Sequence, residues 1–127
     1  MREIRFRAWD KRENTMRDVA VLHFTKGGKV NSIEYWKTPS ELKSYHVRNL
    51  VLMQYTGLDD KNGLGIFEKD IVKAKTADGF EYVYLVDWYE KAREHALFLR
   101  GEAWIRLSVN YEIEVIGNVY EHKYLLE

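Results

Sequence analysis

The stretch that decides the fold reads Asp70-Ile-Val-Lys-Ala-Lys-Thr-Ala-Asp-Gly-Phe-Glu-Tyr-Val-Tyr-Leu-Val-Asp-Trp88. Its two flanks, 70–76 and 80–88, are rich in β-branched and aromatic residues, which fit the pleated surface of a sheet. Between them, Ala77-Asp-Gly79 carries the Asp-Gly pair that favours tight hairpin turns. The stretch predicts two antiparallel strands joined by a short loop.

A two-residue Asp78-Gly79 turn would fix which side chains of this hairpin share a face. In that register Val72 faces Leu85 and Ala74 faces Val83, so this aliphatic side is the core side. The opposite side collects lysines and aromatic rings, which form a candidate contact surface. The members of this surface are Lys69, Lys73, Lys75, Phe80, Tyr82, Tyr84 and Trp88.

Two interpretations of this lysine–aromatic surface stay open. Rings can stack on bases while ammonium groups meet phosphates, which predicts a nucleic-acid-binding module using Lys73, Lys75, Tyr82 and Tyr84. Alternatively, the rings cover the other subdomain and the lysine stems lie across them. In the register above, the acids of the second strand fall on the aliphatic side and do not neutralise the lysines directly.

Short strands separated by turn signals continue after the hairpin. We expect strands at 96–100, 103–107 and 111–120, with a bulge at Gly117-Asn118 inside the last one. The segment that precedes these strands, Glu68-Lys-Asp-Ile-Val72, is similar to the entry into an SH3-like barrel. Regular spacing of this kind predicts a small five-stranded SH3-like barrel over residues 64–127.

Before the hairpin, the chain predicts a second β subdomain. Residues 3–9 alternate between apolar and basic side chains, and a strand at 15–25 leads to a two-residue turn within Lys26-Gly-Gly-Lys29. That turn would place Leu22 opposite Ile33 and Ala20 opposite Tyr35. Residues 50–56 form an apolar run of strand length, which predicts a central strand covered on both sides.

One short helix is expected over residues 39–47. Thr38 can cap it, Pro39 suits the first helical position, and Glu41 can complete a capping box. The predicted fold is therefore mainly β, with an N-terminal subdomain at 1–57 that contains the helix and packs on the C-terminal barrel. The polar loop from Gly57 to Gly65 separates the two.

Composition narrows the class of protein. The 127 residues carry 20 Lys plus Arg against 20 Asp plus Glu, which disfavours a general nucleic-acid binder. The charges are unevenly spread: the first seventeen residues are rich in arginine, and the last sixteen in glutamate. These ends are either solvated edges or surfaces that attract each other, within one chain or between copies. No cysteine, signal peptide or membrane-length apolar run is present, which predicts a cytoplasmic protein.

Candidate catalytic and metal-binding groups are few. The four histidines have no partner at ligand spacing, and Gly63-Leu-Gly65 lacks the third glycine of a dinucleotide-binding motif. Carboxylates are plentiful, and the densest group, at residues 59–70, is an acid/base candidate; turn capping and loop solubility account for it as well. We expect no catalytic residue, no cofactor and no metal. The members of the densest group are Asp59, Asp60, Glu68 and Asp70.

Four segments resemble the YopX family. They are Ile4-Arg-Phe-Arg-Ala-Trp-Asp10, Met53-Gln-Tyr-Thr-Gly-Leu-Asp-Asp-Lys-Asn-Gly63, Ile66-Phe-Glu-Lys-Asp-Ile-Val72 and Val115-Ile-Gly-Asn-Val-Tyr-Glu121. The resemblance implies a small, mainly β protein encoded by phages and prophages, hence a bacterial host cell. It implies no particular biochemical activity and carries no catalytic residue onto this chain.

This chain departs from the family's pattern at two places. The family usually has glycine before the aspartate of its Glu-Gly-Asp-Ile-Val segment, and Lys69 stands there instead. If the position needs a positive φ, a lysine costs about 1 kcal/mol. The family's Asn-Pro near the end is replaced by His122-Lys123, which predicts a different course for the tail.

Three functions remain as hypotheses from the sequence. The first is a non-enzymatic phage accessory module that binds an unknown protein partner or assembles with itself, away from membranes. The second is the nucleic-acid-binding module described above. The third is an enzyme whose carboxylates lie in the loop at residues 59–70.

Overall fold

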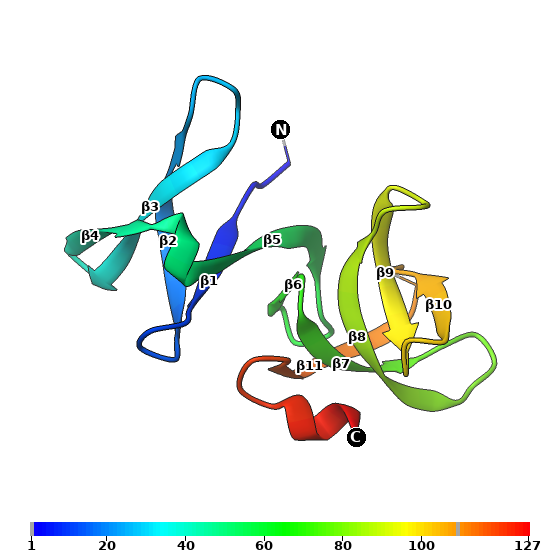
Figure 1. Cartoon of the computed structure of the whole chain (residues 1–127). Coiled ribbons are helices and arrows are strands. Elements are labelled where there is room, and N and C mark those ends of the chain that lie inside the picture. The colour runs from blue at the N-terminus through cyan, green and yellow to red at the C-terminus, as the bar shows by residue number, and fades with distance from the viewer. Residues whose placement is uncertain (1, 109) are drawn as a thin grey trace. The chain divides into compact units, whose positions relative to one another are not determined.

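The computed structural model describes residues 2–108 and 110–127 and is mainly β (Figure 1). Its contacts divide the chain into a first unit, Glu3–Gln54, and a second unit, Tyr55–Glu127. Each unit is built on antiparallel strands. The strands of the first unit are β1 (Phe6–Asp10), β2 (Thr15–Phe24), β3 (Val30–Thr38), β4 (Glu41–His46) and the beginning of β5 (Leu50–Asp59).

The first unit is a sheet with the strand order β4-β3-β2-β1-β5. One face holds the core cluster, in which Ala8 and Ile33 are fully buried and Tyr35 is nearly so. Leu22 lies opposite Ile33, as the sequence predicts. Tyr35 lies opposite Val19 rather than Ala20, because a bulge between Val19 and Val21 shifts the register.

The helix predicted over residues 39–47 is wrong. Residues Glu41–His46 form strand β4, which pairs with β3 through Pro39-Ser40 as a tight turn with Thr38 opposite Glu41. Tyr45 packs beside Tyr35 with the two ring centroids 6.3 Å apart. A nine-residue helix has little stability of its own, so strand pairing and ring packing prevail over the capping signal. The only helical turn nearby is η1 (Val47–Asn49).

A buried carboxylate closes the β1–β2 loop. Asp10 is 0% exposed, and its Oδ1 accepts hydrogen bonds from the backbone N–H groups of Arg12 and Glu13. Its Oδ2 accepts from Nε and Nη2 of Arg17, both at 3.2 Å. The Arg17 guanidinium also lies 4.5 Å from the centre of the Tyr35 ring. Asp10 thus connects the loop to the core cluster of the first unit.

The second unit contains a five-stranded antiparallel sheet in the order β10-β9-β8-β7-β11. The end of β5 pairs with the short strand β6. The core cluster of the second unit contains four fully buried residues of the sheet, Val72, Ala74, Val86 and Leu97. The remaining elements are β6 (Gly65–Phe67), β7 (Asp70–Lys75), β8 (Glu81–Tyr89), β9 (Glu94–Leu99), β10 (Ala103–Arg106), β11 (Glu112–Asn118) and η2 (Lys123–Leu126).

A closed SH3-like barrel does not form. The sheet ends at β10 on one side and at β11 on the other, and within residues 2–108 and 110–127 these two strands are not paired with each other. A bulge is present in β11, one residue before the predicted place: the register shifts between Val115 and Gly117, while Gly117 and Asn118 pair with Ile71 and Asp70. The strand succession of the prediction is therefore confirmed, but the closure is not.

The predicted register of the β7–β8 hairpin is wrong by one residue. Val72 lies opposite Tyr84 and Ala74 opposite Tyr82, instead of opposite Leu85 and Val83. The loop has three residues, Ala77–Gly79, because Thr76 N–H donates to the Phe80 carbonyl oxygen at 3.3 Å. This is the three-residue loop that ends in a left-handed glycine, and Gly79 has φ of 84°.

Side chains stabilise this three-residue loop. Oδ1 of Asp78 accepts a hydrogen bond from the Thr76 hydroxyl at 2.7 Å and another from Phe80 N–H at 3.0 Å. Those bonds lower the pKa of Asp78, the one from Thr76 contributing most. Because side chains alternate along a strand, one additional loop residue moves every β8 side chain to the other face relative to β7.

Lys69 occupies a strained backbone conformation, with φ of 70°. We expect Lys69→Gly to be more stable than Lys69→Ala by about 1 kcal/mol, because only glycine adopts this conformation freely. Both substitutions remove the ion pair between Lys69 and Asp87, so their difference reports the backbone alone. Urea denaturation measures it. Lys73, in the extended strand β7, is the control: there the Gly variant should be less stable than the Ala variant. If Lys69→Gly is no more stable than Lys69→Ala, the backbone at residue 69 is not strained.

Candidate interaction surface

The face of the second-unit sheet that lies opposite the core cluster is called the outer face below. On β8 it carries the alternate positions Glu81, Val83, Leu85 and Asp87, while Tyr84 and Val86 point into the core. Leu85 lies opposite Phe98 of β9. The outer face therefore presents half-buried aliphatic and aromatic groups between two acids.

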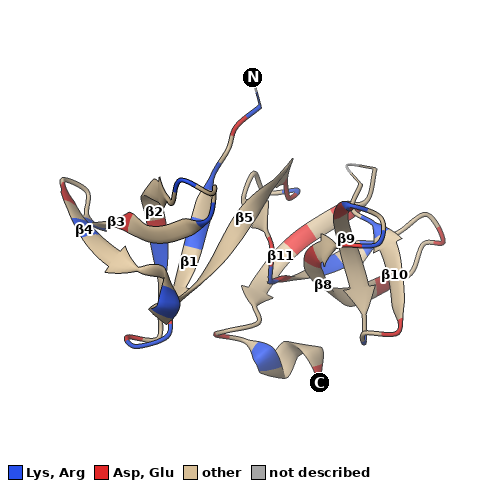
Figure 2. Ribbon diagram, turned by 45° about the horizontal axis from the view of Figure 1, so that its top comes forward, with Lys and Arg blue, Asp and Glu red and all other residues tan. Residues whose placement is uncertain are grey.

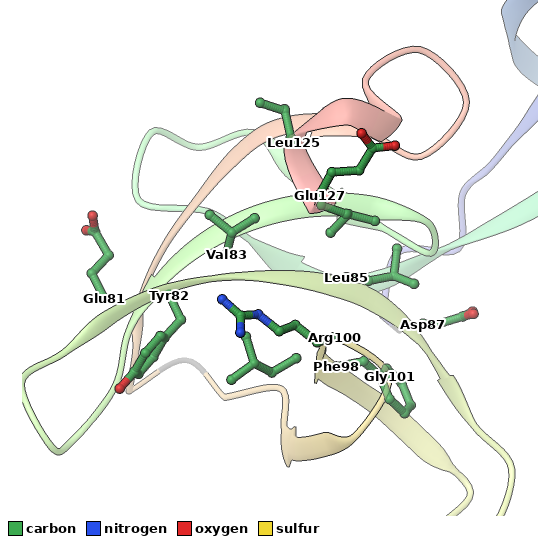
Figure 3. A pocket seen from close by; sticks show the side chains of 12 residues that line it. Glu81, Tyr82, Val83, Leu85, Asp87, Phe98, Arg100, Gly101, Leu125 and Glu127 are labelled. Atoms are coloured by element: carbon green, nitrogen blue, oxygen red, sulfur yellow. The ribbon is translucent and has the colours of Figure 1, made fainter.

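A groove of about 890 Å³ lies on the outer face. Figure 3 shows Val83 and Leu85 projecting from β8, with Phe98 and Arg100 on one side of them and Leu125 and Glu127 on the other. Its apolar lining is only half-buried, since no other segment of the described chain fills the groove. Its full lining is Glu81, Tyr82, Val83, Leu85, Asp87, Phe98, Leu99, Arg100, Gly101, Leu125, Leu126 and Glu127.

Two irregular segments form the walls of this groove. The β9–β10 corner turns through Arg100 and Gly101, with φ of 54° and 69°, and the Glu102 N–H donates to the Leu99 carbonyl oxygen. This corner places Arg100 beside Phe98 at the groove. The short helix η2 supplies Leu125 and Leu126 to the other wall.

An aromatic cluster lies beyond Phe98. The Tyr89 ring lies 5.6 Å from Phe98 and 4.4 Å from Trp104, centroid to centroid. Trp104 lies opposite Phe98 in the β9–β10 ladder and remains 43% exposed. Exposed aromatic side chains near half-buried aliphatic ones are typical of protein-binding surfaces.

The lysines of the predicted contact surface lie on the outer face, but the acids lie there with them. Nζ of Lys73 lies 3.5 Å from Oε1 of Glu81. Lys69 contacts Asp87 in the same way. On the other side of β7, Lys73 is opposite Glu114 and Lys75 is opposite Glu112. Lys69 and Lys73 are thus paired with acids of β8, contrary to the prediction, and Lys73 and Lys75 also have acids opposite them on β11.

The aromatic residues of the predicted surface that lie on β8, Tyr82, Tyr84 and Trp88, alternate with the outer-face positions, and Tyr82 also lines the groove. Tyr84 is only 5% exposed, and burial together with the negative charge of Asp78 raises the pKa of its phenol. Tyr82 packs edge-on against it with centroids 6.2 Å apart, and Phe80 follows at the loop. Trp88 packs against His95 with centroids 5.1 Å apart. The structure does not bring the lysines and these rings together as one surface.

Each acid of the loop at residues 59–70 has a structural partner. Asp60 is 7% exposed; its Oδ1 accepts from the N–H groups of Asn62 and Leu64, and its Oδ2 from that of Val115. Asp59 accepts from the Tyr55 hydroxyl at 2.6 Å, and buried Asp70 accepts from Phe67 N–H at 2.8 Å. These bonds confirm turn capping for Asp60.

A small hollow of about 250 Å³ lies beside this loop, between Asp59, Tyr111 and Glu112. Burial alone would raise the pKa of Asp60, but the backbone N–H groups of Val115, Leu64 and Asn62 lower it overall. A carboxylate fixed by three backbone donors and held ionised is a poor general acid. The hollow is therefore weak support for catalysis.

The fourth acid of the loop, Glu68, forms a pair with His95. Oε2 of Glu68 lies 2.9 Å from Nε2 of His95, and both side chains are less than one-fifth exposed. No group of three or more His, Cys, Asp or Glu side chains suited to a metal ion occurs in residues 2–108 and 110–127. In the same part of the chain, no helix has the length and apolar character to span a membrane.

Fold and surface define a small antiparallel β protein of two units, whose second unit has a grooved outer face. A family model described as "YopX protein" matches residues 5–127. The chain belongs to the YopX family. None of the curated proteins matches it significantly.

Two solved structures share its fold. One is protein EF1440 from Enterococcus faecalis, with a TM-score of 0.67 and 24% identity over 100% of both chains. The other is the yopX protein from Bacillus subtilis, with a TM-score of 0.68 and 21% identity over 100% of this chain and 98% of that one. At this level of identity the likeness establishes the fold alone.

Proposed function

We propose that this chain is a non-enzymatic protein-interaction module whose binding site is the outer-face groove of the second unit. The observation that carries the proposal is the groove itself, with half-buried Val83, Leu85 and Phe98 between charged rims. Burial of apolar surface of this kind is the main driving force of protein association. The structural bonds of Asp59, Asp60 and Asp70 support the non-enzymatic part of the proposal.

The same proposal places the protein in the cytoplasm of a bacterial host as an accessory protein of a phage or prophage. Its support is the YopX family, to which the chain belongs. Nucleic-acid binding through the lysine–aromatic surface has less support. The lysines lie beside Glu81, Asp87, Glu112 and Glu114, and the Tyr84 ring is buried in the core cluster.

Leu85→Lys should block the groove. A library of short random peptides is selected on the wild-type protein, and binding of the selected peptides is then compared between variants. We expect at least about tenfold weaker binding to Leu85→Lys, which corresponds to ~1.4 kcal/mol, because its cation replaces the centre of the apolar lining. The lysine stem can still cover Phe98, so folding should survive.

Leu64→Lys is the matched control, since Leu64 is 55% exposed and does not line the groove. Its affinity for the selected peptides should equal that of the wild type. Equal binding to Leu85→Lys and Leu64→Lys would contradict the groove as the binding site, as would a selection that yields no peptide.

A further inference from the structure

The charged side chains that line the groove differ in whether they already have an ionic partner. Oε1 of Glu81 lies 3.5 Å from Nζ of Lys73, and Asp87 contacts Lys69. Within residues 2–108 and 110–127, by contrast, no ion pair involves Arg100. The guanidinium of Arg100 is therefore available to a ligand. The charged residues of the lining are Glu81, Asp87, Arg100 and Glu127.

The lysines of β7 have acids on both neighbouring strands. Besides the acids of β8, Lys73 lies opposite Glu114 and Lys75 lies opposite Glu112 on β11. Figure 2 shows acidic positions on β11. An anionic ligand beside these lysines would meet like charges, which oppose binding. Arg100 follows β9, which lies on the other side of β8 from β7, so it is a separate cation on the outer face.

The Arg100 side chain extends along the apolar lining of the groove. Figure 3 shows it directed toward Tyr82 and Val83, whereas the Glu127 carboxylate points away from β8. The charged group that faces the apolar centre is thus a cation. An ion pair formed beside apolar side chains is less screened by water than one in open solvent, so it contributes more to binding. The groove therefore favours an occupant with an acid next to an apolar side chain.

We infer that the groove binds an acidic peptide segment of a partner protein, in which a carboxylate lies next to, or next but one to, a bulky apolar side chain. The carboxylate accepts hydrogen bonds from the Arg100 guanidinium, whose paired N–H donors match its two oxygens. The apolar side chain packs on Val83, Leu85 and Phe98. The inference rests on the proposed function, because it names the chemistry of the partner of the same groove.

Charge reversal at Arg100 tests the inference. Peptides selected from the random library on the wild-type protein should contain aspartate or glutamate beside a bulky apolar residue. Arg100→Glu should bind them about tenfold more weakly or worse, because repulsion replaces attraction. Arg93→Glu is the matched control. Arg93 is also exposed and has a similar backbone, with φ of 53° against 54° for Arg100, but it does not line the groove, so its variant should bind almost as wild type does.

A charge swap in the peptide gives the complementary measurement and shows that Arg100→Glu still folds. Replacing the acid of a selected peptide by lysine should weaken its binding to wild type and restore binding to Arg100→Glu. Salt should weaken the binding of the acidic peptide to wild type, since the screening length falls from about 10 Å at 0.1 M to about 3 Å at 1 M. A peptide with glutamine in place of the acid should respond less to salt.

Selected peptides without acids overturn the inference, as does equal binding to Arg100→Glu and Arg93→Glu. Neither result touches the proposed function if the same peptides lose affinity for Leu85→Lys. A selection that yields no peptide overturns both. Two other occupants would also overturn the inference: a single-stranded oligonucleotide that competes with the peptide and needs Arg100, or a second copy of the chain, shown by self-association that the peptide inhibits.

Discussion

Asp60→Ala should destabilise the second unit by about 4 kcal/mol, the largest effect that we expect from one substitution. The Asp60 carboxylate is the partner of the N–H groups of Asn62, Leu64 and Val115, and it joins the β5–β6 loop to β11. Alanine leaves these donors without an acceptor in a buried site, at about 1–3 kcal/mol each before relaxation. Urea denaturation gives the loss.

Asp59→Ala is the matched control in the same loop. Asp59 is exposed and accepts only the Tyr55 hydroxyl among the bonds described for it, so the loss should be about 1 kcal/mol or less. Equal losses for the two variants would contradict the structural role of Asp60. Amide hydrogen exchange should show faster opening in β6, β7 and β11 of Asp60→Ala.

The lowered pKa of Asp60 makes its contribution dependent on pH. The stabilisation is complete above the ordinary value of 3.8 and is lost as pH falls through the lower folded-state pKa. Asp60→Asn should therefore flatten the acid side of the stability curve. A wild-type curve and an Asp60→Asn curve that fall in parallel below pH 4 would contradict this assignment.

Asp10→Ala should destabilise the first unit by about 3 kcal/mol. It leaves the partly buried Arg17 guanidinium without its carboxylate, and breaking one side of such a pair is costly. It also frees the N–H groups of Arg12 and Glu13. Hydrogen exchange should accelerate in β1 and β2, the strands that this loop joins.

Arg17→Met is the complementary variant for Asp10. It should cost less, about 1–2 kcal/mol, because Asp10 keeps two backbone donors and methionine still covers the Tyr35 ring. The double variant should show a coupling energy well above zero. Additive losses would mean that the Asp10–Arg17 contact does not stabilise the unit.

Most of the strand pattern could be predicted from the sequence, because alternating side chains and Asp-Gly or Gly-Gly pairs specify strands and turns locally. The register could not. Ala77-Asp-Gly79 is compatible with a loop of two residues or of three, and the choice depends on the Asp78 bonds to Thr76 and Phe80. That single residue moved Tyr84 into the core and Glu81 beside Lys73.

Other parts of the site depend on contacts between distant residues. Leu125 and Leu126 look like an ordinary tail in the sequence, and only the fold places them beside Val83 and Leu85. The helix prediction failed for a related reason, because Thr38-Pro-Ser-Glu41 fits both a helix start and a hairpin turn, and pairing with β3 decides. In the sequence, only the adjacent pair Leu125-Leu126 indicates the groove, and two neighbouring leucines near the end of a chain are a weak indication.

Methyl chemical shifts measured during titration with a selected peptide test the binding groove most directly. The account predicts that the perturbed methyl groups are those of Val83, Leu85, Leu125 and Leu126. Perturbation confined to Leu58 and Ile66, beside the hollow at Asp59, or to the first unit would contradict it.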